Sequence, residues 1–248
     1  MTHDSHYERI PQVAGFVSLM VALAIVDPLS SYLIQKSVSQ PLAAMLTLLV
    51  AGTAAYLVEW IIETAINDSA WIRRFFVGSH FIEGTWIDVA LEDGRAKYVG
   101  IVHIEYDRQR FTFNGEDAIT SWSAGDRCVL DPDGYFCSEM TVFDWPNLRH
   151  KFSGRNSEAA GRGFHEGYGE VHFTAREDGP PIDYNATFCY LGGGETFETK
   201  GWRLGKSDRA KLDNPQTRAE VLLCYVCQAE PRARDVARVI DFSEGGDG

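Results

Sequence analysis

Side chains that could perform chemistry are scattered along this sequence of 248 residues rather than grouped. The motif Cys224-x-x-Cys227 has no second cysteine pair to complete a zinc site. No two histidines stand four residues apart, and no H-E-x-x-H motif occurs; the histidines beyond residue 100 are His103, His150, His165 and His172. We therefore expect no metal site, no cofactor and no enzymatic activity.

The charge balance limits the partners that the chain can bind. The formal net charge is −12, from 35 acidic and 23 basic residues. Residues 1–66 contain five acids and two bases, a net of −3, so the remainder carries −12 − (−3) = −9. Non-specific binding of long nucleic acid needs a broad basic face, which such a domain lacks. A small anionic ligand in a local pocket is compatible with this balance.

Two apolar runs occupy residues 13–66 and organise the chain. The first run, 13–26, meets Asp27-Pro28 and resumes over 29–34; the second covers 42–66. About 20 apolar residues in a helix span a bilayer core, so the pattern predicts two transmembrane helices. A buried core hairpin and a cleaved signal peptide are the alternatives. A signal peptide needs a basic first region and a small-residue cleavage site, but residues 1–10 hold one arginine among acids and histidines, and no good A-x-A site follows.

The basic residues beside the two runs predict the orientation in the membrane. Arg9 precedes the first run, Arg73 and Arg74 follow the second, and only Lys36 lies between them. Because lysine and arginine concentrate on the cytoplasmic side, we expect a multi-pass inner-membrane protein with both termini and the large domain in the cytosol. The five cysteines all follow the hairpin, and their odd number fits free thiols in a reducing compartment.

Small residues recur every four positions within both runs. Such spacing lets helix backbones approach closely in lipid, either within one hairpin or between copies of the chain. Asp27 is the exception, because an ionisable group at bilayer depth usually faces a partner or a water path; alternatively, Asp27-Pro28 ends a short helix near the far interface. The candidates for self-association in the membrane are Ala14, Ser18, Ala22, Asp27, Ala51 and Ala55.

After residue 80 the pattern changes to alternation with frequent turn residues. Turn chemistry stands at Glu92-Asp93-Gly94, Asp107-Arg108-Gln109, Asp131-Pro132-Asp133-Gly134 and Glu177-Asp178-Gly179-Pro180. Eight or nine short antiparallel strands are expected, in an up-and-down barrel or a sandwich. Their predicted ranges are 81–91, 97–107, 110–114, 117–123, 135–143, 148–153, 164–175, 182–191 and 195–204.

These patterns divide the chain into five segments. They are an arm (1–12), two transmembrane helices (13–66), a connector (67–79), a lipocalin- or streptavidin-like barrel (80–205) and C-terminal helices with a tail (206–248). In the last segment, Asn214-Pro215 provides an N-cap and a first-turn proline for a helix over 216–230. Pro231 begins a second helix that ends near Asp241.

The tripeptide Gly84-Thr85-Trp86 lies on the first predicted strand. Lipocalin-type barrels often carry Gly-x-Trp there, with the indole closing one end. The order of segments also resembles the two-transmembrane β-barrel effectors of bacterial CBASS anti-phage systems. Residues 82–86 resemble the first barrel strand of that family, Phe136-Cys137-Ser138 its aromatic-x-Ser strand, and residues 148–154 the alternating strand that follows.

The resemblance implies a function. In that family a partner nucleotidyltransferase makes a cyclic dinucleotide on infection, the barrel binds it, and the assembled effectors breach the inner membrane. Arg149, Lys151 and Arg203 would then neutralise the phosphates. The polar and aromatic candidates for the bases are Tyr98, Trp122, Ser138, Tyr184, Thr187 and Tyr190. A tethered lipocalin-like sensor or carrier of an apolar ligand, with an aliphatic pocket, is the alternative; a membrane-anchored enzyme and a structural adaptor are two others.

Overall fold

The computed structural model describes residue 7 and residues 9–107, 110–122, 128–156, 163–191 and 196–230. The chain forms two compact units, Met1–Phe81 and Ile82–Gly248. Each unit has its own secondary structure.

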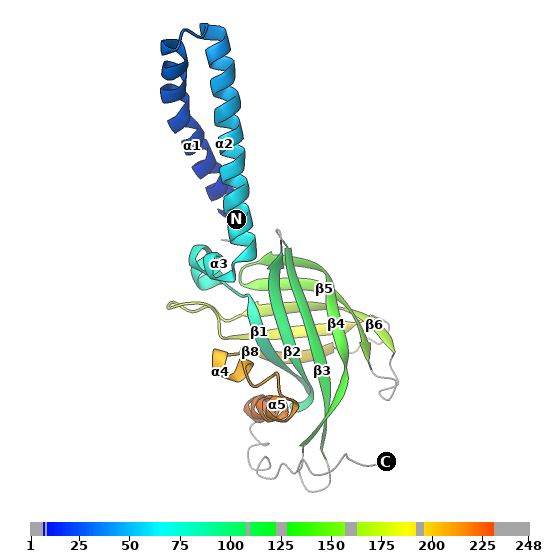
Figure 1. Cartoon of the computed structure of the whole chain (residues 1–248). Coiled ribbons are helices and arrows are strands. Elements are labelled where there is room, and N and C mark those ends of the chain that lie inside the picture. The colour runs from blue at the N-terminus through cyan, green and yellow to red at the C-terminus, as the bar shows by residue number, and fades with distance from the viewer. Residues whose placement is uncertain are drawn as a thin grey trace, which may run out of the picture. The chain divides into compact units, whose positions relative to one another are not determined.

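The first unit is a pair of long helices. Helix α1 (Arg9–Gln35) and helix α2 (Gln40–Asp68) pack side by side (Figure 1). Helix α1 continues through Pro28 to Gln35, so the alternative that Asp27-Pro28 ends a short helix is wrong. Pro28 removes one backbone donor from the helix interior but does not end it.

Both helices are long and apolar enough to cross a membrane. Their candidate spans are Pro11–Gln35 and Gln40–Asp68, with mean hydropathies of 2.0 and 1.9. Most of their large apolar side chains are exposed, among them Phe16, Leu48 and Tyr56. A helix that is apolar all round must be covered by lipid or by other protein, and these helices are covered only in part by each other.

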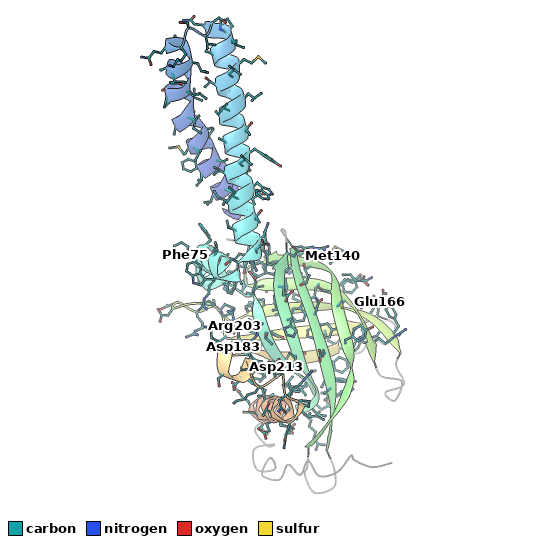
Figure 2. The ribbon with its side chains drawn as sticks, viewed as in Figure 1. Phe75, Met140, Glu166, Asp183, Arg203 and Asp213 are labelled. Atoms are coloured by element: carbon teal, nitrogen blue, oxygen red, sulfur yellow. The ribbon has the colours of Figure 1, made fainter. Side chains whose placement is uncertain are left out.

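A short amphipathic helix, α3 (Ala70–Val77), follows at Ser69, whose hydroxyl accepts a hydrogen bond from the Ile72 amide at 3.4 Å. The buried Arg73 guanidinium donates to the Ile66 carbonyl at 2.8 Å, which satisfies a carbonyl at the end of α2. Trp71 and Phe75 are each 77 % exposed (Figure 2 labels Phe75). The one-turn 3₁₀ helix η1 (Gly78–His80) ends this unit.

The second unit is a closed eight-stranded barrel in which each strand pairs with the next along the chain (Figure 1). This confirms the predicted up-and-down barrel. Strands β8 and β1 also pair, which closes the sheet. The strands are β1 (Gly84–Glu92), β2 (Arg95–Asp107), β3 (Arg110–Trp122), β4 (Cys128–Asp144), β5 (Asn147–Asn156), β6 (Phe164–Phe173), β7 (Asp183–Tyr190) and β8 (Thr196–Arg203).

Two predicted boundaries were wrong. The ranges 110–114 and 117–123 belong to one strand, β3, and Asp131-Pro132-Asp133-Gly134 lies inside β4 rather than in a turn. The register of β3 and β4 shifts between Asp117 and Ala118, opposite Gly134 and Pro132. A bulge leaves a residue outside the ladder and accommodates a missing N–H, so residues typical of turns serve a bulge here.

Other predicted turns are confirmed. Asp93 and Gly94 connect β1 to β2 with φ angles of 52° and 77°, the left-handed values that a two-residue hairpin turn requires. Asp107 pairs directly with Arg110 across the next hairpin, whose two tip residues lie outside the described residues. Turn residues 177–178 lie in the connection between β6 and β7.

The outer face of β1 and β2 is covered by a helix. Helix α5 (Pro215–Ala229) follows a one-turn helix, α4 (Lys206–Arg209), and the Asn214 side chain caps it by accepting from the Gln216 amide at 2.9 Å. This confirms the predicted 216–230 helix; the predicted second helix lies outside the described residues. The buried cluster beneath α5 contains Ile87, Val89, Val99, Ile101, Leu222 and Val226.

Candidate functional site

Strand alternation decides which side chains face the interior of the barrel. Residues paired across neighbouring strands lie on the same face. Since Ile87 and Val89 pack outward against α5, Trp86, Asp88 and Ala90 face inward. Following the register around the barrel places Tyr98, Phe113, Phe136, His150, Phe152, His165, Tyr184, Phe188, Tyr190, Phe197, Thr199 and Arg203 on this inner face.

Five of the inward-facing rings are each seated over a glycine. A Cβ atom built on any of these glycines would lie less than 3 Å from the ring of its register partner. In each pair the large ring fills the space that the glycine leaves open. This is a strong form of the alternation of large and small residues in small barrels. The pairs are Phe136 with Gly115, Phe152 with Gly167, His150 with Gly169, His165 with Gly154 and Tyr184 with Gly201.

Trp86 closes one end of the barrel. It is fully buried, and its indole N–H donates to the Ile82 carbonyl at 3.0 Å. The Arg203 guanidinium lies over the indole with Cζ 5.6 Å from the ring centroid, and it also donates to the Glu83 carbonyl. Tyr184 and Phe173 contact the indole with ring centroids at 5.3 and 5.5 Å. This is the closed-end tryptophan expected from Gly84-Thr85-Trp86.

The placement of Arg203 leads to a prediction about stability. Replacing Arg203 by methionine removes a cation–π contact and a charge-assisted hydrogen bond while keeping an apolar stem. We expect the barrel to lose about 2 kcal/mol of its free energy of unfolding. Urea denaturation measures this loss. The lysine variant should recover only part of it, since lysine lacks the planar guanidinium; full recovery would contradict the proposed contact.

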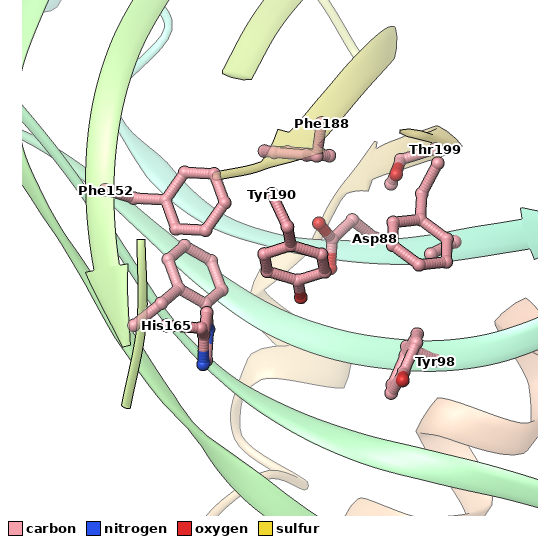
Figure 3. A pocket seen from close by; sticks show the side chains of 10 residues that line it. Asp88, Tyr98, Phe152, His165, Phe188, Tyr190 and Thr199 are labelled. Atoms are coloured by element: carbon pink, nitrogen blue, oxygen red, sulfur yellow. The ribbon is translucent and has the colours of Figure 1, made fainter. Parts of the chain in front are cut away.

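An aromatic cavity lies inside the barrel (Figure 3). On β1 it is lined by Asp88 and Ala90, the inward-facing residues that follow Trp86. Its volume is about 50 Å³, room for a few water molecules. Six of the ten lining side chains are phenylalanines or tyrosines, and the other four are Ala90, Asp88, His165 and Thr199. The aromatic set is Tyr98, Phe136, Phe152, Phe188, Tyr190 and Phe197.

The cavity contains a buried carboxyl group. Asp88 is 7 % exposed, and burial raises its pKa to about 7, although backbone N–H groups, including that of Gly100, act in the opposite direction. No ion pair to Asp88 is found among the described residues. The Thr199 hydroxyl, which faces the same cavity, is buried without a hydrogen-bond partner in the described part of the chain.

His150 also faces the interior of the barrel and lies among its aromatic rings. It stacks on Phe113 with ring centroids 4.5 Å apart, and burial lowers its pKa to about 4. Neither of its ring nitrogens has a hydrogen-bond partner within the described ranges. The imidazole is therefore neutral near pH 7 and acts as one more ring of the aromatic filling.

A cation stands beside two rings of the cavity. The Lys97 ammonium is 4.9 Å from the ring centroid of Phe197 and 5.7 Å from that of Tyr98. It also pairs with the half-exposed Glu92 at 2.7 Å, next to the tight turn between β1 and β2. Lys97 therefore lies at the end of the cavity nearest this turn.

Only two of the six residues predicted for the bases are found in the described lining of the cavity. Tyr98 and Tyr190 line the cavity. Ser138 and Tyr184 also face inward, but Ser138 accepts from the Phe113 amide at 2.8 Å and Tyr184 packs on Trp86. Thr187 faces outward in register with Glu170. The side chain of Trp122 lies outside the described residues.

The cations predicted for the phosphates lie elsewhere. Arg149 is on the outer face, 64 % exposed, and pairs with Glu170 at 2.9 Å. Lys151 is also on the outer face, where Glu139 and Glu166 lie 2.7 and 3.3 Å away and raise its pKa (Figure 2 labels Glu166). Arg203 is at the closed end. None of these three cations therefore lines the cavity.

Sequence reasoning missed most of the cavity. Phe152 and His165 follow from strand alternation only once the register is known, because an inward and an outward series look equally plausible along β5 and β6. The informative pattern was the glycines, which mark the inward face of β6 at Gly167 and Gly169. The missed residues are Asp88, Lys97, Phe136, Phe152, His165, Phe188, Phe197 and Thr199.

The small residues of the first unit pack within one chain. Ala14, Ser18 and Ala51 are buried between α1 and α2, Ala22 and Ala55 are half-buried, and Asp27 is exposed. This is the intrachain packing that close helix approach predicts. No hydrogen bond or ion pair to Asp27 is found among the described residues.

Neither the cavity nor the remaining described residues gather three or more metal-ligating side chains. No protein-family model, curated protein or solved structure matches this chain. The functional argument therefore depends on the geometry of the barrel and of the helical pair.

Proposed function

We propose that this protein is a membrane-anchored effector whose barrel binds a cyclic dinucleotide, and that ligand-driven self-association of its two apolar helices disrupts the inner membrane, as in the CBASS effectors that the sequence resembles. The aromatic cavity carries the proposal. Bases stack on aromatic rings, and this contributes about 1–3 kcal/mol per base. The proposed activity is binding without turnover of the ligand.

The chemistry of the lining favours a planar ligand over an aliphatic chain. A carrier of fatty acids would need aliphatic walls, whereas this cavity has six aromatic rings, a carboxyl group and a hydroxyl. Burying a carboxyl group beside a hydrocarbon ligand is unfavourable. These features support the nucleotide proposal against the lipocalin-like alternative.

The size of the cavity constrains how the ligand is held. About 50 Å³ is small against the roughly 300–1,000 Å³ of ordinary ligand pockets. We propose that one base enters after rings such as Tyr190 and Phe197 move aside, and that the sugar–phosphate ring remains at the mouth beside Lys97. Such rearrangement slows association relative to binding at a preformed site.

The helical pair must act through assembly. Two helices have too little surface to enclose a water path, so membrane damage requires several copies. A ligand can shift this equilibrium only through different affinities for the single and the assembled states. We therefore propose that the occupied barrel favours contacts between copies and that exposed apolar surfaces of α1 and α2 then meet in the bilayer.

The decisive experiment is calorimetry on the full-length protein in lipid nanodiscs with cyclic dinucleotides and, in parallel, fatty acids. We expect saturable binding of at least one cyclic dinucleotide and its recovery intact after incubation. Dye-loaded liposomes containing the protein should then leak on addition of that ligand. Binding of fatty acids alone would support the carrier instead, and silence across the dinucleotide panel would overturn the proposal.

A matched pair of lysine variants locates the phosphates. Lys97→Gln should weaken dinucleotide binding about fivefold, mainly through slower association and a smaller salt dependence, as expected for a cation at the rim of a site. Lys151→Gln, on the outer face, should leave the affinity unchanged. Surface plasmon resonance at two salt concentrations separates the variants. The reverse pattern would place the ligand on the outer wall.

A further inference from the structure

The position of Asp88 in the cavity bears on which base the barrel would accept. Asp88 faces the interior from β1, and its register partners on both neighbouring strands are glycines, Gly100 on β2 and Gly201 on β8. Gly100 contributes no side chain to this row, and the ring of Tyr184 occupies the space over Gly201. Figure 3 shows this carboxyl group among the rings of the cavity rather than in the wall.

The described charged groups nearest in the fold are engaged elsewhere. Lys97 pairs with Glu92 near the β1–β2 turn, and Arg203 lies over Trp86 at the closed end. A carboxyl group buried without a cation is costly. Backbone N–H groups, including that of Gly100, donate to this carboxyl group, but each carboxyl oxygen has a second lone pair that can accept from a ligand. Inside an apolar space such a hydrogen bond is strong because water does not compete.

A second acceptor lies close by in the register. Thr199 on β8 pairs with Ala90 on β1, two residues beyond Asp88, and its buried hydroxyl has no partner among the described residues. Above its pKa of about 7 the Asp88 carboxyl group is ionised, and this form offers two oxygens side by side that only accept hydrogen bonds. The complementary ligand is a flat ring that presents two adjacent N–H donors.

Among the nucleobases, this requirement selects guanine. The Watson–Crick edge of guanine has the N1–H and the N2 amino group next to each other, both donors. Adenine and cytosine present one donor beside one acceptor, and uracil presents a single donor between two carbonyl oxygens that would repel the carboxylate. The stacking rings accept any base, so the discrimination falls to Asp88.

We propose that Asp88 reads the Watson–Crick edge of a guanine inserted into the aromatic cavity, with Thr199 beside it, so that the barrel prefers guanine-containing ligands. This inference rests on the proposed function for the cyclic dinucleotide. It is separable from it, because it also predicts binding of the guanine nucleotide alone.

The test is calorimetry on the full-length protein in nanodiscs with cyclic diguanylate, cyclic diadenylate, GMP and AMP. We expect cyclic diguanylate to bind roughly 10- to 100-fold more tightly than cyclic diadenylate, the discrimination of one bidentate contact. Asp88→Asn should lose that factor for guanine and gain affinity for adenine, since an amide offers one donor and one acceptor. Asp183→Asn on β7, which is not among the cavity residues, is the control and should change neither affinity.

The outcomes separate the two proposals. Equal or tighter binding of cyclic diadenylate, or an unchanged preference in Asp88→Asn, would overturn the guanine inference and leave the proposed function in place. Asp88-dependent binding of GMP without binding of any cyclic dinucleotide would support the inference and overturn the proposed function. Binding of none of the four ligands would overturn both. Thr199→Val, which should weaken guanine binding severalfold with the barrel intact by circular dichroism, keeps the test valid if Asp88→Asn fails to fold.

Discussion

Replacing Asp88 by asparagine should raise the free energy of unfolding of the barrel by about 4 kcal/mol near pH 8 and change it little near pH 4. Burial raises the pKa of Asp88 from its ordinary value of 3.8 to about 7. Because the folded state holds this proton more tightly than the unfolded state, wild-type stability falls as the pH rises through this window. A difference of about three pH units corresponds to about 4 kcal/mol. Asparagine cannot ionise, so the variant escapes the loss.

His150 gives the free energy of unfolding the opposite pH dependence, over nearly the same pH range. Burial lowers its pKa from 6.5 to about 4, so the unfolded state binds more protons and the contribution of His150 to stability is lost as the pH falls through this window. The size of this effect is about 3 kcal/mol. In the wild type the two slopes nearly cancel between about pH 4 and 6.5, which predicts a flat stability profile there.

Urea denaturation of the second unit, residues 82–248, across this pH range measures both effects. Asp88→Asn should show stability rising by about 3 kcal/mol from about pH 4 to 6.5, because only the His150 slope remains. Asp213→Asn, at an exposed position before α5, should retain the flat wild-type profile. A flat profile in Asp88→Asn as well would refute the argument.

Replacing Gly201 by alanine should destabilise the barrel by about 3 kcal/mol. The added methyl group would lie less than 3 Å from the ring of Tyr184. That ring cannot withdraw, because it is buried against Trp86 and Phe173 with centroid distances of 5.3 and 5.6 Å. The strain must therefore displace strand β7 or β8, or the closed end.

Thermal and urea denaturation of Gly201→Ala measure the loss, with Gly205→Ala as the matched control. A Cβ atom on Gly205 meets nothing within 4 Å, and its φ of −69° suits any residue, so this variant should be neutral or slightly stabilised. Shortening the ring in the double variant Gly201→Ala, Tyr184→Leu should recover part of the stability. Equal effects of the two single glycine variants would refute the packing argument.

The features that local pattern determines were predictable from the sequence. The two apolar helices follow from length and hydropathy, α5 from Asn214-Pro215, and the β1–β2 hairpin from Asp93-Gly94. The tryptophan at the closed end follows from its place on the first strand. Each of these features depends on residues that are neighbours in the chain, so each can be predicted without knowing the register of the strands.

The site was less predictable because it depends on long-range pairing. A shift of one residue exchanges the inner and outer faces of a strand, and β5 carries Arg149 and Lys151 on one face and His150 and Phe152 on the other. Without the register, the sequence did not show that the cations lie on the face away from the cavity. Within β4 the residues Asp131 to Gly134 also resembled a turn, because a bulge and a turn both favour residues that interrupt a ladder.

The rings seated over glycines have a consequence for the evolution of this barrel. A single change at Gly167 or Gly201 meets a ring, while a single loss of Phe152 or Tyr184 leaves a void, so either half alone is penalised. Homologues should therefore exchange both members together and keep the combined size of each pair rather than its residues. An alignment of divergent sequences would then show covariation between positions 152 and 167 and between 184 and 201, even where overall identity has faded below detection.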